Sequence, residues 1–462
     1  MQATEEPLSW AATRLAAAIR SREISSRELL ELELERVKEQ NPRVNAVVTI
    51  DEDGAGAAAR RADELTARGG SLPPLHGLPV TIKDAIETAG MRSTGGAIEL
   101  TDHVPTDDAP SVARLKQAGA IVFGKTNVPR WSEDMQTYNA IFGTTNNPHD
   151  VQRTAGGSSG GAAAAVATGM TAFELGTDIG GSIRIPSHFC GVCGHKPSFG
   201  VVSQRGYLGY LGSGGTDSDL NVFGPLARTV GDLELLMDVL VGPDVELATA
   251  WTLRLPPARH AELADYRIGV WIDDPDGELD IEVRALLHHA VAALGDAGAQ
   301  VSDSRPALGL AESDEVFWPL VLGAASPRLP DDVAVEVGGP HARWIRHRDR
   351  AAELRRRWRE WFATHDVLLC PVMPVPAFPH DLAGTFSDRS LAINGQPVPH
   401  ARTLPWIGLI GVAYLPATVV PVGRTASGLP VGIQVVGPYL EDRTALFVAR
   451  HLAQLLAPAG TD

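Results

Sequence analysis

The sequence predicts an α/β fold organised as one large domain. The chain has 462 residues, of which 44% are apolar, so it is long enough to bury a large core. Short apolar segments alternate with amphipathic segments of helical period, an order that is typical of sheets with parallel strands. No low-complexity linker divides the chain. These three observations favour a single domain around a central sheet.

The first part of the chain, residues 1–70, is predicted to form a helical outer layer. The segment WAATRLAAAIRSREISSRELLELELERVKEQ has apolar residues every three to four positions, and the pair Ser25 and Ser26 offers an N-cap for its second helix. After Leu75 the sequence changes to short apolar stretches broken by glycine and proline. That pattern predicts strands at 78–82, 120–124 and 201–204, with a crossover helix between the first two.

The second half repeats the alternation. YRIGVWI predicts a strand at 266–272, EVRALLHHAVAALGDAG a helix at 282–298, and AQVSDS another strand. HDVLLCPVMPVPAFP predicts a buried strand that enters a proline-rich loop. Residues 401–462 supply two more strands and the helix DRTALFVARHLAQLLA, which we expect to return to the core. Between these parts, the tract 245–400 is expected to be the loosest.

The charge balance argues against nucleic acid and membranes as partners. With 56 acidic and 40 basic residues, the net charge is -16, which repels phosphate backbones and anionic lipid surfaces. The one basic stretch, RHRDRAAELRRRWREW at 346–361, is predicted to be a solvated helix with an aromatic stripe rather than an RNA-binding surface. The N-terminus lacks the pattern of a secretory signal, and no apolar stretch reaches the roughly 20 residues of a membrane helix. We therefore expect a cytoplasmic protein.

The chain has three cysteines, which fits a reducing compartment better than a disulfide framework. Cys190 and Cys193 form a C-x-x-C motif in SHFCGVCGHKP. A zinc site would need two further ligands at matching spacing, and a thioredoxin-like site would need a preceding strand. Two packed thiols are the favoured interpretation, with no metal bound.

A glycine-rich loop, AGGSSGGAAAA at 155–165, permits several interpretations. No lysine follows its glycines, which excludes a phosphate-binding P-loop. GGSSG does fit G-x-S-x-G, the nucleophile elbow of α/β hydrolases, with Ser158 at the tip. An elbow must follow a buried strand, however, and the preceding TTNNPHDVQRTA is polar. The elbow remains as a disfavoured alternative in which Ser158 is the nucleophile.

A second glycine loop, GTDIGGSIRIP at 176–186, favours a different nucleophile. Gly180 and Gly181 stand directly before Ser182, and successive glycine N–H groups can form a concavity that stabilises an oxyanion. A serine needs a base, and a lysine serves if burial keeps it neutral. Lys83 closes the apolar stretch GLPVTI, a position that fits either a catalytic base or a snorkelling side chain.

Together these motifs resemble the amidase signature family of serine hydrolases. The matching segments, in order, are LHGLPVTIKD, GKTNVP, FGTTNNP, GGSSGG, GTDIGGSIRIPSHFCGVCGHKP and LPVGIQVVG. They place the signature core at 75–230. The resemblance implies a single domain with a central mixed β-sheet covered by helices on both faces, and it assigns 245–400 to the variable segment that shapes the substrate pocket.

The resemblance also implies a catalytic triad. Ser182 corresponds to the nucleophile, Ser158 to the serine that follows a cis peptide bond and relays the proton, and Lys83 to the base. The oxyanion hole falls on the N–H groups of Ile179, Gly180, Gly181 and Ser182.

Other positions in these loops have weaker expectations. We expect Ser159 to support the triad, and Asp178 and Arg184 to pair and hold the nucleophile loop. Trp131, Ser132 and Met135 follow GKTNVP, where the family often contacts substrate, although packing roles are as reasonable.

The implied activity is hydrolysis of amides through an acyl-enzyme, without a metal or organic cofactor, by a monomer or homodimer. The apolar segments SDEVFWPLVLG and TLPWIGLIG favour small uncharged amides, anilides or carbamates, with esters open to the same chemistry. Two alternatives remain beside the α/β hydrolase. They are the glutaminase-type component of a tRNA-dependent amidotransferase, and a signature protein that has become a binding module.

Overall fold

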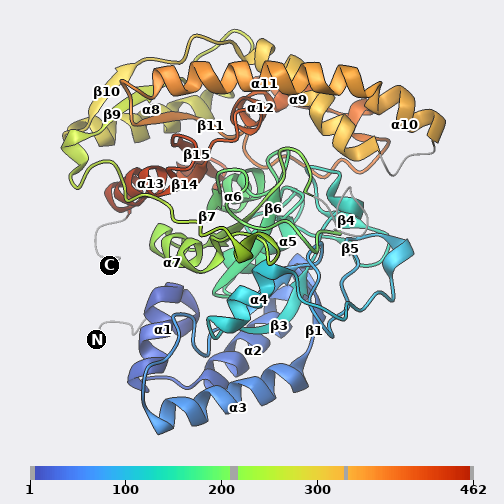
Figure 1. The fold of residues 1–462 in the computed structure, drawn as a ribbon, viewed down its shortest axis with the longest axis vertical. Coiled ribbons are helices and arrows are strands. Elements are labelled where there is room, and N and C mark those ends of the chain that lie inside the picture. Colours follow the sequence, from blue (N-terminus) through green and yellow to red (C-terminus); the bar gives the residue numbers. More distant parts are fainter. Residues whose placement is uncertain (1–5, 209–216, 327–330, 458–462) are drawn as a thin grey trace.

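The computed structural model describes residues 6–208, 217–326 and 331–457, and its centre is one sheet of eleven strands (Figure 1). In spatial order the strands are β1 (Val47–Ile50), β3 (Ile121–Thr126), β2 (Pro79–Lys83), β6 (Phe173–Asp178), β8 (Val222–Ala227), β7 (Cys193–Lys196), β14 (Ala417–Arg424), β15 (Pro430–Val436), β11 (Val367–Pro371), β9 (Arg267–Val270) and β10 (Gln300–Asp303). Two small hairpins lie outside this sheet, β4 (Tyr138–Asn139) with β5 (Gly143–Thr144) and β12 (Ser390–Ile393) with β13 (Gln396–Pro399).

The sheet is mixed. β2 pairs in parallel with both β3 and β6, and β9 pairs in parallel with both β10 and β11. The remaining neighbours in the large sheet are antiparallel. The predicted fold class, one large α/β domain with a central mixed sheet, is therefore confirmed.

Helices cover both faces of the sheet. The helices are α1 (Ala12–Ser21), α2 (Ser26–Val44), α3 (Glu52–Arg68), α4 (Pro110–Gln117), α5 (Gly160–Ala167), α6 (Arg184–Cys190), α7 (Val230–Leu240), α8 (Ile281–Asp296), α9 (Leu310–Ala325), α10 (Asp331–Gly338), α11 (His341–Trp361), α12 (Pro405–Gly411) and α13 (Asp442–Leu456). α2, α3, α5 and α6 pack on one face, and α4, α7, α8 and α13 on the other. α9 to α12 form a further layer at the top of Figure 1.

Alternation along the strands explains the two separate cores. Val122 and Phe123 are neighbours on β3, so their side chains point to opposite faces. Phe123 packs with α2, α3 and α5, whereas Val122 packs against the larger cluster on the other face. On the first face α5 presents Ala162–Ala165, all fully buried, and these small side chains let the helix lie close to the strands.

Most predicted elements are present. Ser25 caps α2 through a capping box with Glu28, and the predicted strands and helix of 266–303 appear as β9, α8 and β10. The strand predicted at 201–204 is wrong, because that segment forms a turn after Ser198. The ladder position is taken instead by β7, whose residues CGHK include a glycine and two polar side chains and so lack an apolar pattern.

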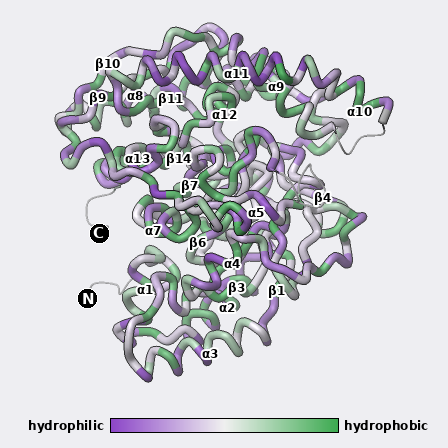
Figure 2. The backbone as a smooth tube through the Cα atoms, viewed as in Figure 1, coloured by the Kyte–Doolittle hydropathy of each residue, from purple (hydrophilic) through white to green (hydrophobic). Residues whose placement is uncertain are grey.

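The basic helix is the solvated element that the sequence predicts. Figure 2 shows hydrophilic residues recurring along α11, and its buried side chains are Ala351, Leu354 and Trp358. Among the described residues, no helix is long and apolar enough to cross a membrane.

Asp366 fastens three segments of the tract 245–400 to one another. Its buried carboxylate accepts hydrogen bonds from the Arg267 backbone N–H at 2.9 Å, from Arg267 Nη2 at 2.8 Å and from Arg259 Nη1 at 3.1 Å. These contacts join the start of β9, the start of β11 and the loop before β9. A buried carboxylate with several donors is costly to remove because its cationic partners lose their counter-ion.

We expect Asp366→Ala to lower the free energy of unfolding by about 3 kcal/mol. The measurement is urea denaturation followed by tryptophan fluorescence. Asp303→Ala, which removes an exposed carboxylate at the end of β10, is the matched control and should change stability by less than about 0.5 kcal/mol. Equal effects of the two substitutions would show that Asp366 does not fasten this tract.

Candidate active site

The predicted catalytic residues meet at one edge of the sheet. Lys83 is the last residue of β2, and Asp178 is the last residue of β6, the parallel neighbour of β2. The carboxyl ends of parallel neighbours lie at the same edge. Ser158 stands two residues before α5 and Ser182 two residues before α6, so both glycine loops open at this edge.

Lys83 is fully buried and lies against two hydroxyl groups. Its Nζ donates hydrogen bonds of 2.7 Å to Ser158 Oγ and 2.7 Å to Thr177 Oγ1. Burial lowers the pKa of Lys83 to about 7, although the negative charges of Asp178 and Glu174 oppose that shift. The side chain therefore sits near the balance between ammonium and neutral amine at neutral pH.

The loop that carries Ser158 is packed tightly between its neighbours. The peptide bond between Gly157 and Ser158 is cis. A Cβ on Gly157 would lie 2.5 Å from the Asp134 carbonyl oxygen, so only glycine fits there. Ser159 joins the two glycine loops, because its N–H donates to the Ser182 carbonyl oxygen at 3.1 Å and its Oγ donates to the Thr177 carbonyl oxygen at 3.3 Å.

Asp178 organises the loop between β6 and α6. Its carboxylate accepts from Arg184 Nη2 at 2.9 Å and Nε at 3.0 Å, and from the backbone N–H groups of Gly181 at 2.9 Å and Ile183 at 3.1 Å. Burial alone would raise the pKa of Asp178, but the Arg184 charge and these hydrogen bonds lower it to about 2. The carboxylate is therefore ionised at neutral pH and holds the loop by charge-assisted bonds.

The donors available for an oxyanion are fewer than expected. The expectation included Gly181, but its N–H donates to Asp178, so it is already used. For the N–H groups of Ile179, Gly180 and Ser182, the described part of the chain provides no hydrogen-bond acceptor. Gly181 has a different role in the loop. Its φ of 96° lies in the left-handed region that favours glycine, so it allows the backbone to turn directly before Ser182.

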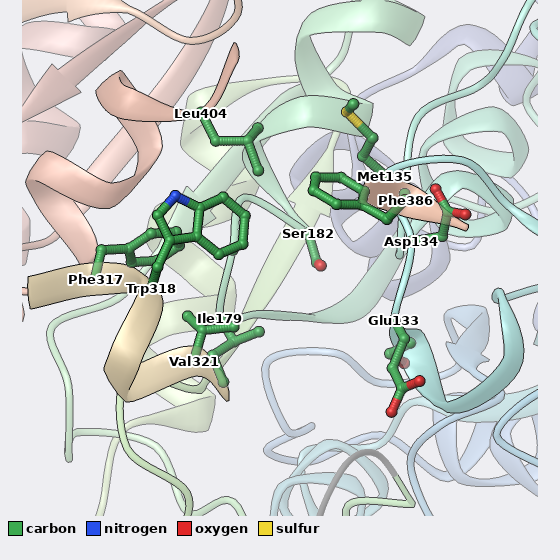
Figure 3. A pocket seen from close by; sticks show the side chains of 13 residues that line it. Glu133, Asp134, Met135, Ile179, Ser182, Phe317, Trp318, Val321, Phe386 and Leu404 are labelled. Atoms are coloured by element: carbon green, nitrogen blue, oxygen red, sulfur yellow. The ribbon is translucent and has the colours of Figure 1, made fainter. Parts of the chain in front are cut away.

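Ser182 opens into a narrow cleft with a volume of about 80 Å³ (Figure 3). Its side chain is not sealed in the core, since the residue keeps 7% of its surface exposed. Figure 3 shows Phe317, Trp318, Ile179 and Val321 on one side of the serine and Met135, Phe386, Asp134 and Glu133 on the other. The remaining lining residues are Ser132, Gly157, Gly180 and Leu404.

The cleft is mainly apolar, and the charge of Asp134 is balanced. Arg389 Nη1 donates to Asp134 Oδ2 at 2.7 Å, and the Tyr138 hydroxyl donates to the same oxygen at 3.0 Å. The Ser132 hydroxyl is buried and has no hydrogen-bond partner among the described residues. Among the described residues that line the cleft there is no lysine, arginine or histidine.

Of the three residues expected to contact substrate, Ser132 and Met135 line the cleft and Trp131 does not. The aromatic pair Phe317–Trp318 and Val321 come from α9, within the apolar segment SDEVFWPLVLG that favours an uncharged substrate. Phe386 was missed because it lies in a short 3-10 turn without periodicity, whereas Leu404 belongs to TLPWIGLIG, the second apolar segment named from the sequence. The contact of Thr177 with Lys83 was not predicted either, although Thr177 stands directly before Asp178 in the motif GTD.

Neither the elbow nor a metal centre finds support in the described residues. The disfavoured elbow would require a strand directly before Ser158. Residues 148–156 contain turns and isolated bridges instead. Cys190, Cys193 and Cys370 are buried free thiols, in agreement with the packed-thiol prediction. No group of three His, Cys, Asp or Glu side chains is placed to hold a metal ion in the part of the chain that is described.

The chain matches the Amidase family over residues 28–329 and 336–446. Among curated relatives, the A subunit of the glutamyl-tRNA(Gln) amidotransferase from Roseiflexus sp. (strain RS-1) is 35% identical over 464 residues, covering 92% of each chain.

Two solved structures share the fold across almost the whole chain. The A subunit of the glutamyl-tRNA(Gln) amidotransferase from Thermotoga maritima superposes with a TM-score of 0.81 at 26% identity, covering 97% of this chain and 95% of that one. A bacterial aryl acylamidase of the amidase signature family gives a TM-score of 0.84 at 24% identity and 97% coverage of both chains, a likeness of fold alone. With the family match extending over most of the sequence, this chain belongs to the amidase signature family of hydrolases.

Proposed function

We propose that this chain hydrolyses small, uncharged amides, anilides or carbamates, with Ser182 as nucleophile, Ser158 as proton relay and Lys83 as base. The observation that carries the proposal is the 2.7 Å contact between Lys83 Nζ and Ser158 Oγ beside a serine that opens into an apolar cleft. A hydroxyl both accepts and donates, so Ser158 can pass a proton between Ser182 and the amine of Lys83.

The proposed reaction has two halves. Ser182 Oγ attacks the substrate carbonyl carbon while its proton passes through Ser158 to neutral Lys83, and the N–H groups of Ile179, Gly180 and Ser182 stabilise the oxyanion. The proton then returns to the leaving nitrogen, the C–N bond breaks and an acyl-enzyme remains. Water hydrolyses the acyl-enzyme by the same proton path. Asp178, Arg184 and Ser159 position the loops.

The lining of the cleft supports an uncharged substrate. A free amino acid carries a carboxylate, and binding that group out of water calls for a cationic partner. None of the described lining residues is basic, and aromatic or aliphatic side chains lie on both sides of the serine.

A second candidate is the glutaminase component of a glutamyl-tRNA(Gln) amidotransferase. It is supported by overall similarity, since the relatives that bear this enzyme's name are 33 to 35% identical over more than 90% of this chain. The two candidates share the proposed triad and differ in the substrate. For an amidotransferase component, glutamine would be the amide and the chain would act with partners.

We expect Ser182→Ala to lower kcat by at least about 10⁴-fold, because the acyl-enzyme can no longer form. The measurement is release of 4-nitroaniline from 4-nitroacetanilide. Ser71→Ala, at an exposed serine outside the site, should leave the rate unchanged. Mass spectrometry after reaction with a fluorophosphonate should find the label on Ser182. A label on Ser158 would instead support the elbow.

The proposed role of Lys83 as base predicts how kcat/KM depends on pH. Because burial lowers the pKa of Lys83 to about 7, we expect kcat/KM to rise about tenfold per pH unit below pH 7 and to level off above it. Lys83→Met, which keeps an unbranched apolar stem, should lower kcat/KM by at least about 10³-fold and remove this inflection. Lys38→Ala, on α2, is the control.

Burial also lowers the pKa of Lys196 to about 7, so the Lys83→Met variant is needed to assign the inflection to Lys83. An inflection near pH 7 that persists in Lys83→Met would mean that another group is the base.

Substrate preference separates the two candidates. The purified chain alone should hydrolyse 4-nitroacetanilide with a kcat/KM at least about 100-fold above that for L-glutamine, because the apolar walls offer the glutamine carboxylate no cation. Val321→Asp should lower kcat/KM for the anilide at least about tenfold. Leu322→Asp, the same change at the next residue of α9 but outside the cleft lining, should have little effect. Faster hydrolysis of glutamine than of the anilide would favour the amidotransferase component.

A further inference from the structure

A second cavity lies between α11 and the segment that joins β15 to α13, away from the catalytic serine. Its volume is about 720 Å³, and it shares no lining residue with the catalytic cleft. Trp358 of α11, Phe362 directly after that helix, and Leu415 contribute apolar walls, and all three are buried. This volume is in the range of sites that hold small organic ligands.

Arg355 lines this cavity and lacks an acidic partner. Its guanidinium donates one long hydrogen bond, 3.4 Å from Nη1 to the Val412 carbonyl oxygen, and lies 4.4 Å from the centre of the Tyr414 ring. No carboxylate of the described residues pairs with it. Burial lowers the pKa of Arg355, a sign that the loss of water around this cation is incompletely compensated. A bound anion would supply that compensation.

A second arginine follows on the same face of α11. Arg359 is four residues after Arg355, the spacing that places side chains next to each other on a helix. It is exposed, and its side chain makes no hydrogen bond or ion pair with any other described residue. The two guanidinium groups thus give a chain of net charge -16 a local positive site.

The other charged groups of the lining are already paired. Both oxygens of Glu441 accept from Arg259, at 2.6 Å from Nε and 2.8 Å from Nη2. Arg356 donates to Glu360 at 2.9 Å. The described lining therefore has two arginines in excess and no free carboxylate to neutralise them.

A flat aromatic surface adjoins the two arginines. The Tyr439 ring also lines the cavity and remains 43% exposed, while its hydroxyl donates to the Phe199 carbonyl oxygen at 3.1 Å. The hydroxyl bond holds the ring in place, so its exposed surface can pack against a planar group without much loss of conformational entropy.

We propose that this cavity binds a small aromatic anion, whose carboxylate or phosphate pairs with Arg355 and Arg359 and whose ring packs against Tyr439. Arginine suits this role because its planar fork binds a carboxylate or phosphate through two parallel hydrogen bonds. The inference does not depend on the reaction catalysed at Ser182.

The test is isothermal titration calorimetry of the full chain with benzoate and with phenyl phosphate in about 150 mM NaCl, which screens non-specific attraction. We expect at least one probe to bind with a Kd of roughly 1 mM or below. The tighter of the two tells whether the site prefers carboxylate or phosphate. Arg355→Gln should weaken binding at least about tenfold and Arg359→Gln at least about threefold.

Arg350→Gln is the matched control, because it removes the same charge from α11 at a residue outside the cavity that pairs with Glu315. Arg350→Gln should leave binding at this cavity unchanged. Benzoate that binds at the catalytic cleft instead would be recognised because none of the three substitutions on α11 weakens it. If Arg355→Gln unfolds the protein, the Arg359→Gln variant still tests the proposal, because it changes an exposed residue.

Three outcomes would overturn the proposal. One is the absence of saturable binding of both probes, and another is equal weakening by Arg350→Gln. The third is that a tRNA transcript binds through Arg355 while neither aromatic anion does, which would make this surface part of an RNA interface.

Discussion

The burial of one lysine at the end of a strand is the constraint on which the site depends. Removing an ammonium group from water is unfavourable, so Lys83 is tolerated only where hydroxyl groups and nearby negative charges compensate in part. Parallel pairing of β2 with β6 brings Thr177 to the lysine, and the glycine loop before α5 brings Ser158. The compensation is incomplete, so the pKa of Lys83 falls to about 7, which is what its proposed role as a base near neutral pH requires.

Asp178 connects this edge of the sheet to parts of the chain far away in sequence. Its partner Arg184 also donates to the Ile407 carbonyl oxygen at 3.3 Å and to Gln434 Oε1 at 3.3 Å. The nucleophile loop is thereby tied to α12 and to β15 as well as to its own strand. Such a loop is held in one geometry before substrate arrives, which is the condition for effective oxyanion stabilisation.

The alternation of strands and helices predicted the α/β class, and the glycine loops together with the family resemblance singled out Ser158, Ser182 and Lys83. Thr177, the other residue that Lys83 contacts, was not predicted. The use of the Gly181 N–H by Asp178 was not predictable, since it depends on where the carboxylate rotates once buried. β7 escaped prediction because its glycine and polar residues are stabilised by antiparallel neighbours on both sides. Phe386 reaches the cleft from a short 3-10 turn without periodicity, which tertiary packing positions.

α5 and α9 differ in how freely their residues can be substituted. The fully buried alanines of α5 leave no room for larger side chains, so the elements that carry the proposed chemistry tolerate little variation. By contrast, α9 lends Phe317, Trp318 and Val321 to one wall of the cleft and carries none of the proposed catalytic residues. Under the proposed function, substitutions at these three positions would change which substrate fits while leaving the proposed reaction in place.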